Sequence, residues 1–210
     1  SSGAAALCAI GLLRQVANEV DQILQADVMQ ATATVENELD AEVESDEFSR
    51  ASASDTSAQE LKKVMAKALP DDYSGGAAGS GKFMVLQHLL ESLAERADTT
   101  ERVVIVSGYS ASLSTAENMC KKLNLSTSRL DGTVAVDLRT SIVKDFNSGH
   151  GGRVMLLSVV AGGAGLNLVG ANRLILMDVS WNPAHDRQAM GRIWRDGQRK
   201  PVTIYRLIAA

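Results

Sequence analysis

The chain has 210 residues, which is enough for one sizeable domain with additional elements. Its 45% hydrophobic and 22% charged residues are typical of a soluble globular protein. No apolar run approaches the roughly 18 residues that span a bilayer, so we expect no membrane partner. Ser1 to Gln15 has an apolar core with no basic residues before it, which argues against a signal peptide. Because the chain starts with Ser, we expect an excerpt of a longer protein.

The net charge of −4 hides an asymmetry along the chain. Residues 1–80 hold 5 basic and 14 acidic residues, whereas residues 81–210 hold 16 basic and 11 acidic residues. A basic second part favours a polyanionic partner. The two cysteines and three histidines are scattered and show no metal-ligand spacing, so we predict no metal site.

The first 80 residues form two regions. Apolar residues recur at three- or four-residue steps up to about residue 26 and predict a helix over 1–26. Residues 27–80 are acidic and rich in Ala and Ser, with a short helix over Leu61 to Leu69 that ends at Pro70. We interpret 27–80 as a partly disordered insertion or linker.

Gly76 to Lys82 matches the glycines and lysine of a phosphate-binding loop. Phe83 stands where that loop needs a Ser or Thr for magnesium, and no buried strand precedes it. The motif requires both features, so we predict that this stretch binds no phosphate.

Residues 81–210 alternate between helical and strand patterns. Short apolar strands are expected at 103–107, 129–130, 154–158, 174–178 and 202–207, and helices at 83–93, 111–123 and 136–146. A further helix is expected from Pro183 to Gly197, because Asn182 suits the N-cap and glycine is a common stop. This alternation predicts an α/β fold with a parallel sheet covered by helices on both faces.

Small and hydroxyl-bearing residues follow the predicted strands. Ser107, Asp131 to Thr133, Ser158 to Asn167, and Asp178 to Asn182 all lie just after strands. Ligands of parallel sheets bind beyond the carboxyl ends of the strands. Each loop alone could be a tight turn, but their number at one edge predicts an anion site.

The helix after Pro183 carries the clearest candidate chemistry. In a continuous helix, Gln188, Arg192 and Arg195 would share one face, while Ala189, Ile193 and Trp194 would anchor the helix in the core. Guanidinium groups bind phosphate bidentately and stay charged. The alternative is a solvated basic surface.

These stretches together resemble the second RecA-like lobe of superfamily-two nucleic-acid translocases of the Swi/Snf type. The resemblance rests on RLDGT (129–133), AGGAGLNLVGANRLILMD (161–178), WNPAHDRQAMGRIWRDGQRKPV (181–202) and IYRL (204–207), in the family's order and spacing. Ala171-Asn172-Arg173 and the ending RDGQRKPVTIYRL look most similar to the homologous-recombination branch, the Rad-type DNA translocases. Two positions depart from the family pattern: Val160 replaces a frequent Lys or Arg, and Gly108 a common Asn.

The resemblance implies a role for each matching residue. Arg192 and Arg195 match arginine fingers that reach ATP bound by the first lobe. The resemblance assigns ATP binding and coupling to Gly163, Gly165, Asn167 and Gln188. It assigns contacts with the DNA backbone to Ser107, Gly132, Thr133 and Ser158. Trp181 and Asn182 match a coupling motif.

The resemblance also implies the function of the longer protein. We expect residues 81–210 to be a helicase C-terminal lobe, truncated at its C-terminus, of a nuclear ATP-dependent double-stranded-DNA translocase in homologous-recombination repair. ATP and Mg²⁺ would be held mainly by the missing first lobe, so the isolated chain should be inactive. The rivals are a chromatin-remodelling motor lobe, which would meet a nucleosome rather than a recombinase filament, and a non-catalytic RecA-like module that binds DNA or a partner.

Overall fold

The computed structural model describes residues 80–96, 100–159, 165–179 and 183–209. The predictions for residues 1–79 lie outside this part. The chain divides into two compact units, Ser1–Gly81 and Lys82–Ala210, and nearly all described residues belong to the second.

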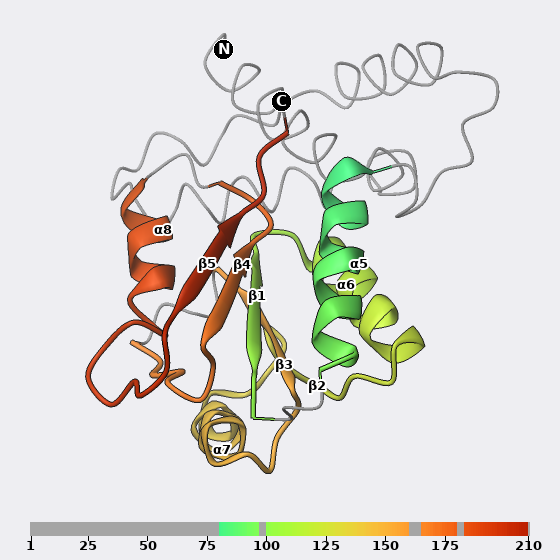
Figure 1. Ribbon diagram of the computed structural model, residues 1–210. Helices are drawn as coiled ribbons and strands as arrows, with labels where there is room; N and C mark the ends of the chain where they lie inside the picture. The colour runs from blue at the N-terminus through green and yellow to red at the C-terminus, as the bar shows by residue number, and fades with distance from the viewer. Residues whose placement is uncertain (1–79, 97–99, 160–164, 180–182, 210) are drawn as a thin grey trace, which may run out of the picture. The chain divides into compact units, whose positions relative to one another are not determined.

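The second unit alternates helices and strands as predicted, and Figure 1 shows their arrangement. The elements are α5 (Gly81–Ala94), β1 (Val103–Ser107), α6 (Ser110–Lys122), β2 (Thr127–Leu130), α7 (Val136–Ser148), β3 (Val154–Ser158), β4 (Arg173–Leu176), α8 (Pro183–Met190) and β5 (Thr203–Arg206). The strands form one five-stranded sheet in the order β2-β3-β1-β4-β5, and every pair is parallel. The predicted RecA-like α/β fold is therefore confirmed.

The apolar composition of the central strands follows from their position. Every residue of β1 and β3 is buried, because helices cover both faces of the sheet. Val104 and Val106 of β1 belong to a core with Phe146 of α7 and Ala189 of α8. Side chains alternate along a strand, so Val103 faces the other side, where it lines a small cavity with Leu90 of α5.

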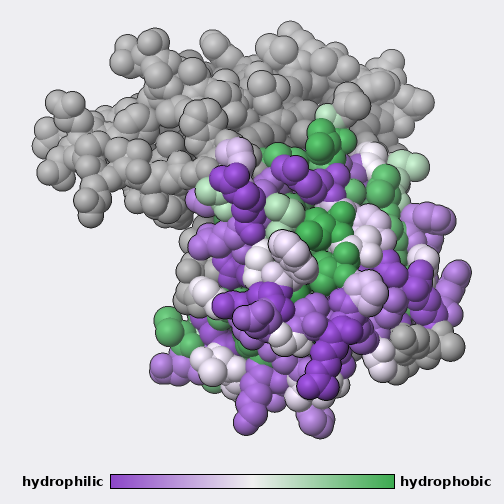
Figure 2. All heavy atoms as spheres, turned by 60° about the vertical axis from the view of Figure 1, so that its left-hand side comes forward, coloured by the Kyte–Doolittle hydropathy of each residue, from purple (hydrophilic) through white to green (hydrophobic). Residues whose placement is uncertain are grey.

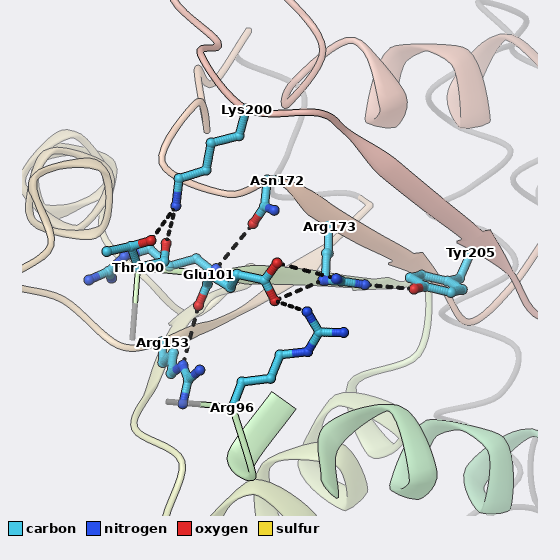
Figure 3. A network of polar contacts seen from close by, with 9 residues as sticks. Arg96, Thr100, Glu101, Arg153, Asn172, Arg173, Lys200 and Tyr205 are labelled. Carbon is cyan, nitrogen blue, oxygen red and sulfur yellow. Dashed lines mark hydrogen bonds and ion pairs between the residues drawn. The ribbon is translucent and has the colours of Figure 1, made fainter. Parts of the chain in front are cut away.

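The amino ends of the strands are joined by a polar network (Figure 3). Glu101, just before β1, accepts hydrogen bonds from Arg96 at 3.0 Å and from Arg173 of β4 at 3.3 and 3.4 Å. Arg173 also donates to the Tyr205 hydroxyl at 2.7 Å. Burial raises the pKa of Glu101, but the bonds and charges of Arg173 and Arg96 outweigh it and leave the pKa below its ordinary value. This network ties β1, β4 and β5 together at the amino edge of the sheet.

The helix after Pro183 is shorter than predicted. It ends at Met190, and residues 191–197 form tight turns in which Arg192 N–H donates to Ala189 and Ile193 N–H to Met190. Gly191 is the local reason, since glycine weakens a helix by about 1 kcal/mol relative to alanine. The prediction that Gln188, Arg192 and Arg195 share one helical face is therefore wrong. Ala189 and Ile193 are buried as predicted, but Trp194 is 73% exposed and does not anchor the core.

Candidate functional site

The carboxyl edge of the sheet contains a topological switch point. The chain leaves β1 towards β2 on one side of the sheet and leaves β4 towards β5 on the other, while β1 and β4 are neighbours. In open parallel sheets, ligands bind in the crevice at such a point. A ligand is therefore expected at the loops after β1 and β4.

Ser107 and Asp178 join these two loops. Ser107 is only 1% exposed. Its hydroxyl donates to Asp178 Oδ2, and the Gly108 amide donates to the same oxygen at 3.0 Å. Ser107 Oγ also accepts the Tyr109 amide at 3.0 Å. A serine hydroxyl has a single proton, so in this arrangement Ser107 shapes the loop and has no proton left for a phosphate.

The loop after β2 is held by a second carboxylate. Asp131 is buried, and its Oδ1 accepts the Thr133 amide at 3.0 Å and the Thr133 hydroxyl at 2.6 Å. Its Oδ2 accepts Arg129 Nε at 2.6 Å. Burial raises the pKa of Asp131, but the bonds from Thr133 and Arg129 outweigh it and hold the pKa below its ordinary value. Gly132 and Thr133 are thereby held in a fixed, exposed turn.

Ser158 lies beside Ser107 but is buried. The two residues are paired in register at the ends of β3 and β1, and the Val159 amide donates to the Ser107 carbonyl at 3.2 Å. Ser158 is 6% exposed. Of the four residues predicted to contact DNA, the structure therefore exposes Gly132 and Thr133 and buries Ser107 and Ser158.

The second group of candidate residues surrounds Arg192, in the turn after α8. The Arg192 carbonyl accepts the Leu168 amide at 2.9 Å, from the segment between β3 and β4. Arg195 Nη1 lies 3.4 Å from the carbonyl oxygen of Gly165 in the same segment, and Gly165 has a left-handed φ of 55°. Asn167, also exposed, accepts Asn147 Nδ2 through its carbonyl at 2.8 Å. The structure thus brings Arg192, Arg195, Gly165 and Asn167 into one region.

The Arg192 guanidinium is the most unusual polar group in the described part of the chain. Arg192 is only 6% exposed, and its Nη1 has no hydrogen-bond partner among the described residues. Burial also lowers its pKa. A buried donor without an acceptor costs about 1–3 kcal/mol, and more for a charged group, so an anion arriving at Nη1 would remove this cost.

The remaining predicted residues are not joined to either group. Gln188 lies exposed on α8, and none of the described contacts brings it to the two arginines. Gly163, Trp181 and Asn182 lie outside the described residues. The described residues contain no group of His, Cys, Asp and Glu that could hold a metal ion, and no helix among them is long and apolar enough to cross a membrane.

An open groove of about 710 Å³ lies next to the arginine turn. It is lined by Trp194, Arg195, Asp196, Gln198, Lys200, Pro201, Val202 and Ile204. Figure 2, which brings the α8 side of Figure 1 forward, shows a mostly hydrophilic surface crossed by a band of hydrophobic residues. Lys200 Nζ donates to the carbonyl oxygen and the hydroxyl of Thr100, both at 2.7 Å, so its charge is directed towards Thr100. Trp194 and Arg195 are large, exposed side chains of this lining.

Sequence reasoning assigned no role to three residues that organise these groups: Asp131, Asp178 and Gln198. Asp131 directly follows β2, and Asp178 lies two residues after the end of β4; this place after a strand was the available signal. Gln198 donates to carbonyl oxygens of three residues, and nothing in the sequence pattern identifies such backbone partners.

Comparisons with known proteins agree with this structure. Residues 81–197 match the model of the helicase conserved C-terminal domain. The chain is 45% identical over 150 residues to the DNA repair and recombination protein RAD54 of Saccharomyces cerevisiae, covering 67% of this chain and 16% of that protein. It is 44% identical over 146 residues to a RAD54-like protein of Drosophila erecta, covering 68% of this chain and 18% of that protein. The chain thus spans less than a fifth of these relatives.

A solved structure of an ATPase domain has a similar fold. The crystal structure of the C-terminal part of the Fun30 ATPase domain matches with a TM-score of 0.57 and 34% identity, covering 73% of this chain and 48% of that one. The chain therefore belongs to the family of the helicase conserved C-terminal domain, as a second RecA-like lobe of the Swi/Snf type close to RAD54.

Proposed function

We propose that this chain is the second lobe of an ATP-dependent double-stranded-DNA translocase acting in homologous-recombination repair in the nucleus. The observation that carries the proposal is Arg192, whose buried Nη1 lacks an acceptor within the described residues. Charge develops on the oxygens of a phosphoryl group during transfer, and an arginine finger that meets it contributes about 10³–10⁵ in rate. Arg192 and Arg195 take that role on the phosphates of ATP bound by a first lobe.

The other site residues divide between ATP coupling and DNA. Gly163, Gly165, Asn167 and Gln188 couple the nucleotide to the lobe interface, and Trp181 and Asn182 form a coupling motif beside it. The exposed Gly132 and Thr133 contact the phosphate backbone. Ser107 shapes the loop after β1 through its bond to Asp178, and the buried Ser158 lies beside it at the end of β3. Backbone contacts position a protein without reading sequence, as a motor that moves along any duplex requires. ATP supplies the phosphoryl group, and Mg²⁺ is held mainly by the first lobe.

The similarity to DNA repair and recombination proteins supports recombination repair over chromatin remodelling. The partner proposed with that role is a recombinase filament rather than a nucleosome. A non-catalytic binding module is disfavoured by Arg192, because such a module gains nothing from a buried guanidinium whose Nη1 has no acceptor among the described residues.

The test is the DNA-stimulated ATPase activity of the full-length protein and its Arg192→Ala and Arg195→Ala variants. We expect kcat to fall about a thousandfold in each variant, with duplex-DNA affinity largely kept. The isolated 210-residue chain should hydrolyse no ATP above background. Wild-type turnover in the Arg192→Ala variant would favour the binding module instead.

A further inference from the structure

The side chain of Gln198 lies at the centre of the contacts that hold the arginine turn. Its Nε2 donates to the carbonyl oxygens of Ile193 at 3.1 Å, Ala171 at 2.7 Å and Val169 at 3.3 Å. Ile193 belongs to the turn after α8, whereas Val169 and Ala171 belong to the segment that leads into β4. One amide group therefore joins two segments that are far apart in the sequence.

The other end of the same side chain fixes a third segment. Gln198 Oε1 accepts the Lys200 amide at 2.9 Å, just before β5. An amide is suited to this position because it has two N–H donors at one end and an acceptor oxygen at the other. A carboxylate could accept from Lys200, but it could not donate to the three carbonyl oxygens.

The same segment also binds the backbone of Arg192. Its carbonyl accepts the Leu168 amide at 2.9 Å, and Leu168 is fully buried. Between this bond and the Gln198 contact with Ile193, the backbone of Arg192 and Ile193 is fixed on the segment 168–171. The backbone that carries the Arg192 side chain is therefore positioned by hydrogen bonds from Leu168 and Gln198.

We propose that Gln198 is the positioning residue of the arginine turn, which keeps Arg192 and Arg195 in the geometry that meets the phosphates of ATP. This inference rests on the proposed function of the two arginines. Orientation is worth a great deal in catalysis, since a misplacement of about 1 Å can cost 10²-fold in rate. Loss of the donors should therefore lower turnover without removing any group that touches ATP.

The experiment compares Gln198→Glu with Gln198→Lys in the full-length protein. Glutamate keeps the acceptor for Lys200 but loses the donors, whereas lysine presents three donors to the carbonyl oxygens. We expect Gln198→Glu to lower kcat by about 10- to 100-fold, with the KM for ATP within about twofold, and Gln198→Lys to restore most of the rate. Gln87→Glu is the matched control, because Gln87 lies exposed on α5 and its side chain bonds Glu91 of the same helix.

A spectroscopic measurement on the 210-residue chain tests the same point without turnover. Trp194 lies in the turn and is 73% exposed, so in a Trp181→Phe background its emission reports the motion of the turn. We expect lower fluorescence anisotropy in Gln198→Glu than in Gln87→Glu, and recovery in Gln198→Lys. If the glutamate variant fails to fold, Gln198→Met takes its place, because it keeps the length of the side chain and removes the donors.

The outcomes separate this inference from the proposed function. A collapse of kcat in Arg192→Ala with wild-type kcat and anisotropy in Gln198→Glu would overturn the inference alone. Unchanged kcat in Arg192→Ala would overturn the proposed function. Equal losses in the glutamate and lysine variants would show that donation to the carbonyl oxygens is not the property that positions the turn.

Discussion

Asp131→Asn tests whether the buried carboxylate holds the loop that follows β2. The side chain of Asp131 is 6% exposed and that of its partner Arg129 is 27% exposed, so the pair lies between two measured regimes. Exposed ion pairs contribute about 0–1 kcal/mol, and breaking a fully buried pair costs about 3–5 kcal/mol. Arg129 keeps its bond to Glu117 at 3.1 Å, and an asparagine oxygen can still accept from Thr133. We therefore expect Asp131→Asn to lower the free energy of unfolding by about 1–3 kcal/mol.

The stability that the Asp131 carboxylate contributes depends on pH. The pKa of Asp131 is lower in the folded chain than its ordinary value, so the carboxylate contributes its full stability above the pKa of the unfolded state. That contribution is lost as the pH falls through the folded pKa. The difference between wild type and Asp131→Asn should therefore be large at about pH 7 and shrink towards about pH 3.

Urea unfolding followed by far-UV circular dichroism measures this difference in the 210-residue chain. Asp145→Asn is the control, because Asp145 lies exposed on α7 and changes the net charge equally. The reasoning is refuted if Asp131→Asn destabilises no more than Asp145→Asn, or if the difference from wild type is the same at both pH values.

Three further predictions concern other parts of the described chain. Glu101→Gln should lower the free energy of unfolding by about 1–3 kcal/mol. Arg96→Gln should lower it by less than about 1 kcal/mol, because the side chain of Arg96 is 46% exposed. Equal losses of the two variants in urea unfolding would contradict this. Gly152→Ala should lower the free energy of unfolding by about 1–3 kcal/mol or more, because the new Cβ would lie 2.3 Å from the Thr127 carbonyl carbon. Gly81→Ala is the control in the same urea unfolding measurement, because its new Cβ would meet no atom within 4 Å. Ser107→Ala should weaken binding of the 210-residue chain to duplex DNA by several-fold, because it removes the hydrogen bond from the Ser107 hydroxyl to the Asp178 carboxylate and thereby loosens the loop after β1; a hydrogen bond to a charged group contributes about 1.5–3 kcal/mol. Unchanged fluorescence anisotropy of labelled DNA would show that this loop has no role in binding.

The sequence predicts the sheet well and the arginine turn poorly, for different physical reasons. β1 and β3 are short apolar runs because both of their faces are buried, and that composition is visible in one dimension. β2 begins at Thr127, earlier than predicted, because its pairing with β3 depends on backbone groups and its residues are polar.

The end of α8 shows what periodicity leaves out. Apolar spacing from Ala189 to Trp194 fits a continuous helix, but Gly191 lets the backbone turn after Met190. The positions of Arg192 and Trp194 then depend on tertiary contacts. Likewise, Ser107 reads as an exposed hydroxyl until the structure places Asp178 beside it. The candidate residues could be named from the sequence, but their partners could not.

The strand order has a consequence for how the chain acquires its structure. β1 is made before either neighbour, since it pairs with β3 from Val154 and with β4 from Arg173. Until those segments emerge from the ribosome, Val103 to Val106 is a short apolar, β-branched stretch with both edges free, the kind of segment that pairs with other chains. Parallel pairing over long sequence separations is also slow to form. We therefore expect the nascent chain to depend on chaperone shielding over the interval between synthesis of β1 and synthesis of β4.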